Sequence, residues 1–371
     1  MSLRDEILEQ PDAARRQLRA STAALHALAD RLRAEPVASV VIAARGTSDH
    51  AAIYAQYVLG LRNGMSTGLA TPSVVSLYGG DPNVRESLVI GISQSGASPD
   101  IVGVVEAARR QHAVTLAITN EPRSELASAA EFVIDLAAGP ERAVAATKTY
   151  TTSLLAIARL SAALTGDSPP AVGTHTEAGD AEADGAEAGA DREAGGAADE
   201  LAAIPDAIAA ALMAEPEVEA IARDLAGGDR SIVVGRGFEY ATAREWALKL
   251  KELAQVFADP YSAADFLHGP IALVQPDIPV LVLAPEGAPA AGQIELLRDL
   301  GDRGIDTLVV SDVAETRALG RWSIAIPAGV PEWLRPIVSI VPAQLFAYHL
   351  TVAKGLDPER PRSLSKVTRT R

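Results

Sequence analysis

Residues 87–99 read SLVIGISQSGASP: a short apolar run, then a loop of small polar residues, then a proline. The run 87–92 has the length and composition of a strand that is covered on both faces. Ser98 suits the N-cap of a helix and Pro99 suits its first position, which predicts a helix over 99–111. A buried strand that passes through a polar loop into a helix is the repeating unit of a parallel α/β sheet.

The same unit recurs on both sides of this stretch. Further apolar, strand-like runs lie at 37–44, 112–119, 131–136, 231–234, 278–284, 307–311 and 322–326. Helical periodicity predicts two helices within 3–35, one from 49 onward, and others over 147–164, 240–256 and 332–354. This alternation predicts an α/β fold with two doubly wound parallel sheets in tandem and a helical N-terminus. We hypothesise that the two halves arose by duplication.

A change of composition separates the two halves. Residues 166–200 consist mainly of Ala, Gly, Glu and Asp, and they carry a net charge of −9 out of −15 for the whole chain. With almost no large apolar side chains, such a stretch cannot bury enough surface to offset the entropy lost on ordering. We expect a disordered acidic low-complexity insert over 166–200, between a first domain over 1–165 and a second domain over 201–350. An extended tail over 351–371 follows.

The overall composition excludes several classes of protein. The 371 residues include no cysteine, which rules out disulfides, cysteine-ligated metals and thiol nucleophiles. No strongly basic stretch is present, which argues against a nucleic-acid partner. The polar start and the lack of an 18-residue apolar run argue against a signal segment and a membrane span. We therefore expect a cytoplasmic protein that binds neither nucleic acid nor membrane.

The polar loop at 93–98 carries the donors that a phosphate group needs. It offers three hydroxyls, one amide and a glycine that lets the backbone come close, at the start of a helix whose free N–H groups and dipole favour anions. The side-chain donors are Ser93, Gln94, Ser95 and Ser98. A serine-rich turn with an ordinary N-cap is the alternative. A second small polar loop, RGTS at 45–48, also follows a predicted strand, and neighbouring strand ends build the ligand crevice of such sheets, which favours the phosphate site.

Motifs in both halves of the chain occur in a familiar order. They are EILEQP at 6–11, GTS at 46–48, ISQSG at 92–96, GRG at 235–237, ALKLKEL at 247–253, HGPIAL at 268–273 and RPRSLSKVT at 360–368. Together they resemble the sugar isomerase (SIS) family and, within it, the isomerase portion of the glucosamine-6-phosphate synthases. The resemblance covers nearly the whole chain except the acidic insert, and it implies two SIS domains in tandem.

The resemblance also implies a role for each matching residue. Phosphate-binding positions are matched by Ser48, Ser93, Gln94, Ser95 and Ser98, and sugar contacts by Gly46, Thr47, Val144 and Ala145. Glu252 matches the acid/base that moves a proton between C1 and C2 of the sugar. His268 matches the group that opens the sugar ring, reaching in from the partner subunit of a homodimer. Lys366 in the tail matches the lysine that engages the open-chain carbonyl, so the tail is expected to contribute to the active site.

The residues around Glu252 support this assignment by their spacing. Glu245, Lys249 and Glu252 are separated by four and three positions, so the predicted helix presents all three on one face. A cation beside Glu252 would favour the ionised carboxylate that a base requires, and Lys249 could also stabilise an enolate oxygen. The alternative is a solvated face with ion pairs worth ~0.3–0.5 kcal/mol each. The resemblance favours a catalytic Lys249 and a substrate-binding Glu245.

The sequence also departs from the family pattern. Arg45, Ala97 and Ala146 stand where small or cysteine, acidic and hydroxyl residues respectively are usual, which leaves the exact sugar open. The chain also has no match to the cysteine-dependent glutaminase domain of the synthases. We therefore expect the degradative direction, in which glucosamine 6-phosphate gives fructose 6-phosphate and ammonia.

Three other functions fit the same residues. The same proton abstraction could drive a lyase reaction, a 2,3-dehydration of N-acetylglucosamine 6-phosphate. Deglycation of fructosamine 6-phosphates uses similar groups, and some SIS modules only bind sugar phosphates as sensors. None of these routes needs a metal or an organic cofactor.

Overall fold

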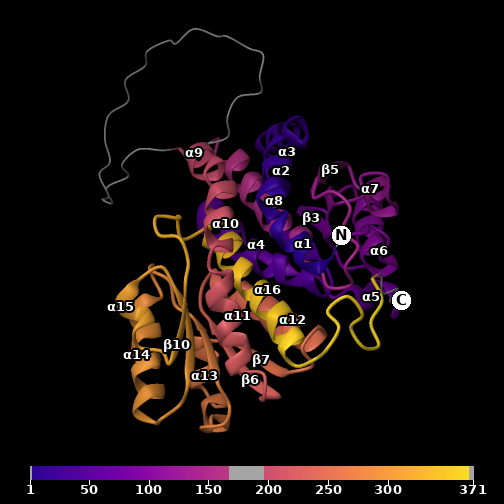
Figure 1. Ribbon diagram of the computed structural model, residues 1–371. Coiled ribbons are helices and arrows are strands. Elements are labelled where there is room, and N and C mark those ends of the chain that lie inside the picture. Colours follow the sequence, from indigo (N-terminus) through magenta and orange to yellow (C-terminus); the bar gives the residue numbers. More distant parts are fainter. Residues whose placement is uncertain (1, 167–195, 367–371) are drawn as a thin grey trace, which may run out of the picture.

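The structure, a computed structural model, describes residues 2–166 and 196–366. It contains two parallel β-sheets of five strands each, with helices packed around them (Figure 1). Most of the predicted acidic insert lies outside the described residues. Helix α9 (Ala197–Ala202) occupies the end of that range, so regular structure resumes before residue 200.

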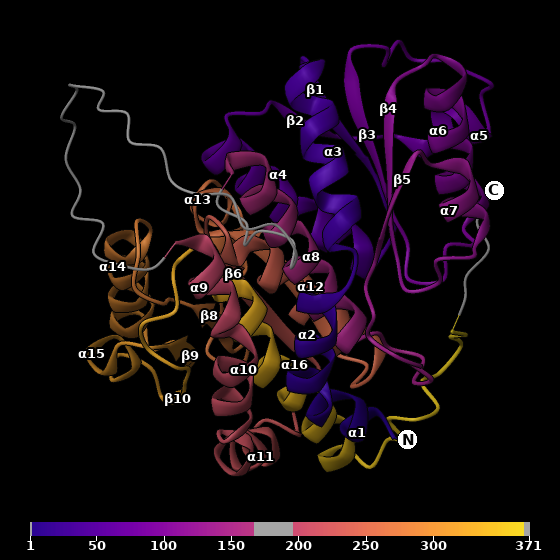
Figure 2. The same ribbon diagram turned by 90° about the horizontal axis from the view of Figure 1, so that it is seen from above.

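The first domain is a doubly wound sheet with strand order β2-β1-β3-β4-β5. Its strands are β1 (Ser39–Ala43), β2 (Thr67–Leu69), β3 (Ser87–Ile92), β4 (Val114–Thr119) and β5 (Phe132–Asp135). Its helices are α1 (Leu3–Leu8), α2 (Gln10–Arg19), α3 (Thr22–Ala34), α4 (Thr47–Asn63), α5 (Pro72–Ser76), α6 (Pro99–Arg110), α7 (Glu125–Ala129) and α8 (Lys148–Thr165). In the register of the central strands, Leu88 of β3 lies between Val40 of β1 and Val114 of β4. Helices α5, α6 and α7 cover one face of the sheet, and α3, α4 and α8 lie over the other (Figure 2).

The second domain repeats this architecture with strand order β10-β9-β8-β6-β7. Its strands are β6 (Arg230–Gly235), β7 (Phe257–Ser262), β8 (Val280–Leu283), β9 (Thr307–Ser311) and β10 (Trp322–Ala325). Its helices are α10 (Ile204–Leu212), α11 (Glu215–Asp224), α12 (Glu239–Glu252), α13 (Ala263–Leu267), α14 (Ala290–Asp302), α15 (Ala314–Arg317) and α16 (Arg335–Ala353), with a 3-10 turn at Pro270–Leu273. Starting from β7, this sheet has the order of the first sheet, so β6 corresponds to β1 and β8 to β3. Matching strand orders agree with the duplication hypothesis.

One apolar core runs through both domains. Helices α4 and α8 of the first domain pack on α12 and α16 of the second, and their buried side chains belong to a single cluster. Within it the rings of Trp246 and Phe346 meet edge to face, with centroids 5.6 Å apart. The buried hydroxyl of Tyr54 on α4 donates a hydrogen bond to the carbonyl of Trp333 at 2.6 Å. The loops at the ends of both sheets are therefore carried by one continuous scaffold.

Helix α16 is the central helix of this core. It is long and apolar enough to cross a membrane by length and composition alone, but most of its apolar stretch is buried in the protein. It packs against α8, α10, α11 and α12. From its end the chain returns to the first domain, where Lys366 contacts Glu141 in the segment between β5 and α8.

The predicted fold class is confirmed, and the differences from the predicted elements have local causes. The predicted strands at 87–92 and 307–311 match β3 and β9 residue for residue. The two predicted N-terminal helices are three, because Pro11 starts a new helix and Ser21 adopts a positive φ of 56°. Strand β7 was missed because its sequence contains Pro260, which is tolerated there since β7 is an edge strand. Strand β2 was missed because it has only three residues.

Candidate functional site

A cavity of about 330 Å³ lies at the carboxyl ends of β1 and β3. These are the neighbouring strands between which the chain order reverses, the position where open α/β sheets bind their ligands. Its lining comes from the two polar loops, the segment 144–146, the end of α12 and the C-terminal tail. The lining residues are Arg45, Gly46, Thr47, Ser48, Ser93, Gln94, Ser95, Ser98, Val144, Ala146, Glu252, Leu364, Ser365 and Lys366.

Gly96 determines the backbone course of the polar loop at 93–98, which we call the serine loop. Its φ of +60° lies in the left-handed region, and a Cβ at this position would lie 2.0 Å from the Oγ of Ser124. Its N–H group donates to the Oγ of Ser93 at 3.1 Å. Only glycine fits this combination of backbone conformation and close approach. The loop therefore turns tightly at the end of β3 and delivers the chain to α6.

Several side-chain hydrogen-bond donors in the two loops make few or no hydrogen bonds among the described residues. Ser98 is the N-cap of α6, but among the described residues its hydroxyl makes no capping hydrogen bond and is paired only with the Ser93 hydroxyl, at 3.5 Å. Within residues 2–166 and 196–366, the Ser48 hydroxyl and the Gln94 amide have no hydrogen-bond partner. Together with the N-terminus of α6 they form a set of donors suited to a phosphate group.

Helix α12 brings charged side chains to this cavity from the second domain. The Nζ of Lys249 lies 2.5 Å from the Oε2 of Glu252 and 3.4 Å from the Oε1 of Glu245, and it donates to the Oγ1 of Thr47 at 3.3 Å. Glu245 also accepts a hydrogen bond from Thr47 at 3.1 Å and contacts the Nδ1 of His50 at 2.7 Å. Both Lys249 and Glu245 are buried. The alternative of a solvated helix face is therefore wrong, because these groups bridge the two domains.

Two neighbouring carboxylates stabilise the positive charge on Lys249. Burial would lower the pKa of this ammonium group, but Glu245 and Glu252 outweigh that effect and raise the pKa above its usual value of 10.5. Lys249 therefore stays cationic at neutral pH. It sits behind Glu252, whose side chain is 23% exposed and faces the cavity.

An ion pair attaches the C-terminal tail to the first domain at the cavity. The Nζ of Lys366 donates to the Oε2 of Glu141 at 2.8 Å, and Glu141 also accepts from the backbone of Thr147 and Thr149 and from the Thr149 hydroxyl. Burial would raise the pKa of Glu141, but Lys366 and these hydrogen bonds lower it below its usual 4.5. Glu141 therefore presents a fixed negative charge to which the tail lysine is attached.

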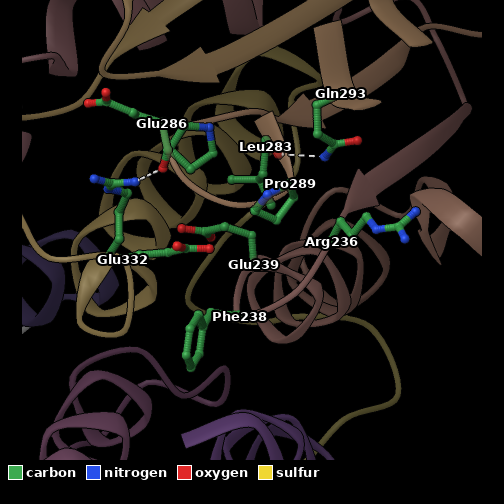
Figure 3. A pocket seen from close by; sticks show the side chains of 10 residues that line it. Arg236, Phe238, Glu239, Leu283, Glu286, Pro289, Gln293 and Glu332 are labelled. Carbon is green, nitrogen blue, oxygen red and sulfur yellow. Dashed lines mark hydrogen bonds between the residues drawn. The ribbon is translucent and has the colours of Figure 1, made fainter. Parts of the chain in front are cut away.

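The corresponding crevice of the second domain is nearly closed. It lies after β6 and β8, and its cavity is only about 10 Å³. Figure 3 shows the side chains that fill it, among them Glu239, Gln293 and Glu332. The Oε2 of Glu332 accepts a hydrogen bond from the backbone of Ala288, just before α14, at 3.2 Å. A carboxylate of the chain thus occupies the place where an anion would bind, so we assign the ligand site to the first domain.

The structure brings most of the predicted site residues together. Those that line the cavity are Gly46, Thr47, Ser48, Ser93, Gln94, Ser95, Ser98, Val144, Glu252 and Lys366. Glu245 and Lys249 lie behind this wall in the charge network, and Ala145 is buried next to Val144 without lining the cavity. His268 lies apart from them: it is exposed at the end of α13 and does not line the cavity. Its predicted entry from a partner subunit stays a prediction.

Three groups at the site were not found from the sequence. Glu141 fixes Lys366, His50 contacts Glu245, and Asp100 pairs with Arg45, whose Nε donates to the Asp100 Oδ2 at 2.9 Å. None of these contacts has a local sequence signal, because the partners lie 225, 195 and 55 residues apart.

Comparison with known proteins agrees with this architecture. The SIS domain family matches residues 35–163 and 224–354, which are the two sheet-bearing units of the fold. The chain belongs to the SIS family. Its SIS domains are also similar to a glutamine–fructose-6-phosphate aminotransferase (isomerizing) of Halobacterium salinarum, with 33% identity over 330 residues, 89% of this chain and 51% of that protein. The chain thus spans about half the length of this relative.

Two solved SIS structures resemble the whole chain. The C-terminal domain of a glucosamine-fructose-6-phosphate aminotransferase from Francisella tularensis has 26% identity and a TM-score of 0.79, over 97% of this chain and 98% of that chain. A glucosamine-6-phosphate deaminase from Thermotoga maritima has 18% identity and a TM-score of 0.73, over 100% of both chains. At that identity the second likeness shows the fold alone.

We predict that Gly96→Ala disrupts the serine loop. The positive φ and the contact with Ser124 should lower the free energy of unfolding by about 1–3 kcal/mol, and phosphate binding should weaken. Denaturant unfolding and calorimetric titration with inorganic phosphate measure the two effects. Gly103→Ala is the control: Gly103 lies within α6 with open space around its Cα, and its substitution should stabilise the helix by up to about 1 kcal/mol. Equal behaviour of the two variants would contradict this account of the loop.

A second prediction concerns the pair of Glu141 and Lys366. Because the folded protein lowers the pKa of Glu141, the pair adds stability above the usual carboxyl pKa of 4.5, and this contribution is lost as the pH falls below it. Glu141→Gln should lower the free energy of unfolding by about 1–3 kcal/mol at pH 7. The difference from the unmodified protein should shrink below pH ~4.5.

Denaturant unfolding of both proteins between pH 7 and pH 3 tests this prediction. Glu121→Gln, at an exposed glutamate, serves as the control for the loss of one negative charge. A Glu141→Gln difference that grows as the pH falls would refute the sign argued here.

Proposed function

We propose that this chain moves a proton between C2 and C1 of a ring-opened hexosamine 6-phosphate, with glucosamine 6-phosphate and water giving fructose 6-phosphate and ammonia. The observation that carries the proposal is the meeting of two groups in one cavity. A set of phosphate donors comes from the first domain, and the Glu252 carboxylate with its Lys249 partner comes from the second.

The phosphate end of the substrate would lie on the serine loop. There the hydroxyls of Ser48 and Ser98, the Gln94 amide and the N-terminus of α6 are available as donors. A phosphate fixed at this end leaves the carbons at the other end of the sugar to reach Glu252 and Lys366, which line the same cavity.

Glu252 is the candidate base. Its carboxylate would take the proton from C2 of the open-chain amino sugar and return it to C1, which leaves an imine at C2. Water then adds to the imine carbon, and ammonia departs as the C2 carbonyl forms. A carboxylate suits this role because it can accept and release a proton without leaving its position.

Two lysines supply positive charge for the intermediate. Negative charge develops on the C1 oxygen while the C2 proton is on Glu252, and a fixed cation nearby stabilises it. Lys366 lines the cavity and is oriented by Glu141, whereas Lys249 is buried behind Glu252. We assign contact with the C1 oxygen to Lys366 and positioning of Glu252 to Lys249.

Ring opening requires a further acid/base, and we assign it to His268 of a second copy of the chain. His268 is exposed beside exposed apolar side chains, those of Leu267 (53%) and Leu273 (58%). Exposed leucines around a functional histidine fit a surface that is covered by a partner. The proposal thus includes a homodimer in which each cavity is completed by the other subunit.

The relatives support the substrate class. The curated relative from Halobacterium salinarum is named for an aminotransferase that acts on fructose 6-phosphate, and a structural relative at 26% identity carries a similar name. Both names join an amino group to a hexose 6-phosphate. The direction and the exact amino sugar are the parts of the proposal that experiment must decide.

We predict that Glu252→Gln abolishes turnover while binding persists. The amide keeps the shape of the side chain but cannot accept the C2 proton, so ammonia release from glucosamine 6-phosphate should fall by about 10²-fold or more. Ammonia is measured with glutamate dehydrogenase, and calorimetric titration tests binding. Turnover equal to that of the unmodified protein would refute the role of Glu252.

Parallel incubation with N-acetylglucosamine 6-phosphate tests the reaction class. Deamination predicts no product from this sugar, whereas an ultraviolet-absorbing unsaturated product would indicate elimination instead. Absence of any product from both sugars would count against the proposed function as a whole.

A further prediction tests whether the His268 and Glu252 of one active site come from different subunits. His268→Ala and Glu252→Gln should each be inactive alone. After the two proteins are mixed, unfolded and refolded together, activity should return to about a quarter of the unmodified value, because half of the dimers are mixed and each of these has one intact site. No recovery would mean that both residues serve the same subunit's site.

A further inference from the structure

Arg45 is the cavity residue for which neither the family pattern nor the proposed reaction supplies a task. It is the first residue of the polar loop at 45–48 and carries a side chain that is 47% exposed. Its Nε donates to the Oδ2 of Asp100 at 2.9 Å, and this is the only polar contact of the Arg45 side chain among residues 2–166 and 196–366. The two terminal nitrogens of the guanidinium therefore have free N–H groups.

The partner of Arg45 fixes where these N–H groups lie. Asp100 is in the first turn of α6, two residues after the N-cap Ser98, and its side chain is almost fully buried. Its other oxygen, Oδ1, accepts a hydrogen bond from the backbone of Ile101 at 3.0 Å. A carboxylate held at both oxygens orients the guanidinium from one edge, so Arg45 is fixed at the N-terminus of α6, beside the serine loop.

The charge around the cavity shows why an arginine is useful there. The charged side chains of the site are the cations Arg45, Lys249 and Lys366 and the anions Asp100, Glu141, Glu245 and Glu252, a net charge of −1 before any ligand binds. Lys249 and Lys366 each pair directly with carboxylates, those of Glu252 and Glu141 respectively. A phosphate dianion at the serine loop would otherwise meet the buried carboxylate of Asp100 without a nearby cation, which Coulomb repulsion disfavours.

We propose that Arg45 binds the phosphate group of the substrate through its terminal nitrogens while Asp100 holds its Nε. A guanidinium presents paired N–H groups that match two oxygens of one phosphate, and charge-assisted bonds of this kind are the stronger ones. The site is thus specific for a doubly charged phosphate ester, with a cation added to the hydroxyl and amide donors. This proposal rests on the placement of the phosphate at the serine loop, but not on the reaction.

Calorimetric titration with inorganic phosphate and with the unreactive sorbitol 6-phosphate tests the proposal without any turnover. Arg45→Ala should raise both dissociation constants by about 10- to 100-fold, and Arg45→Lys should retain part of the affinity. Added salt should weaken binding less steeply in Arg45→Ala than in the unmodified protein. Arg110→Ala, at the exposed far end of α6, is the matched control and should bind both ligands unchanged.

The double variant separates phosphate contact from neutralisation of Asp100. If Arg45 touches the phosphate, then Arg45→Ala still weakens binding at least tenfold when it is made in Asp100→Asn. If Arg45 only neutralises Asp100, its loss has no effect in that background, and the proposal is overturned. Unchanged affinity in the single variant overturns it as well. Because neither ligand reacts, loss of phosphate binding in Arg45→Ala supports the proposal even if no sugar is turned over.

Discussion

The arrangement of the cavity depends on the contacts that the buried ammonium group of Lys249 makes. A buried cation costs several kcal/mol unless carboxylates and hydrogen bonds compensate for the lost water. Lys249 finds them in Glu245 and Glu252 on its own helix and in Thr47 on the first domain. Helix α12 must therefore stay against the start of α4. This contact places the Glu252 carboxylate in the same cavity as the serine loop, although the two lie in different domains.

The two crevices differ although they lie at corresponding positions of two similar sheets. Both sheets have the same strand order, so both have a crevice at the same position. In the first domain the loops end in small side chains and leave about 330 Å³ of space. In the second, Glu332 bonds to the backbone before α14 and leaves about 10 Å³. The second domain instead contributes Glu252 of helix α12 to the cavity of the first domain. The two halves therefore supply different elements to one site.

The fold and the local parts of the site could be predicted from the sequence, and the long-range parts could not. Buried parallel strands are continuous apolar runs, so β3 and β9 are visible as such, and Pro99 marks the start of α6. Spacing along α12 predicts that Glu245, Lys249 and Glu252 share a face, but not that this face is buried. The pair of Glu141 and Lys366 joins residues 225 positions apart, and no local pattern specifies such a contact.

The uninterrupted apolar core between α4, α8, α12 and α16 has a consequence for the two halves. A repeat that meets its neighbour through a polar interface can be separated from it and joined to other domains. Here a cut between the halves would expose the faces of four helices to water. Separating the halves would therefore cost the free energy gained by burying these faces, so the tandem acts as one structural unit.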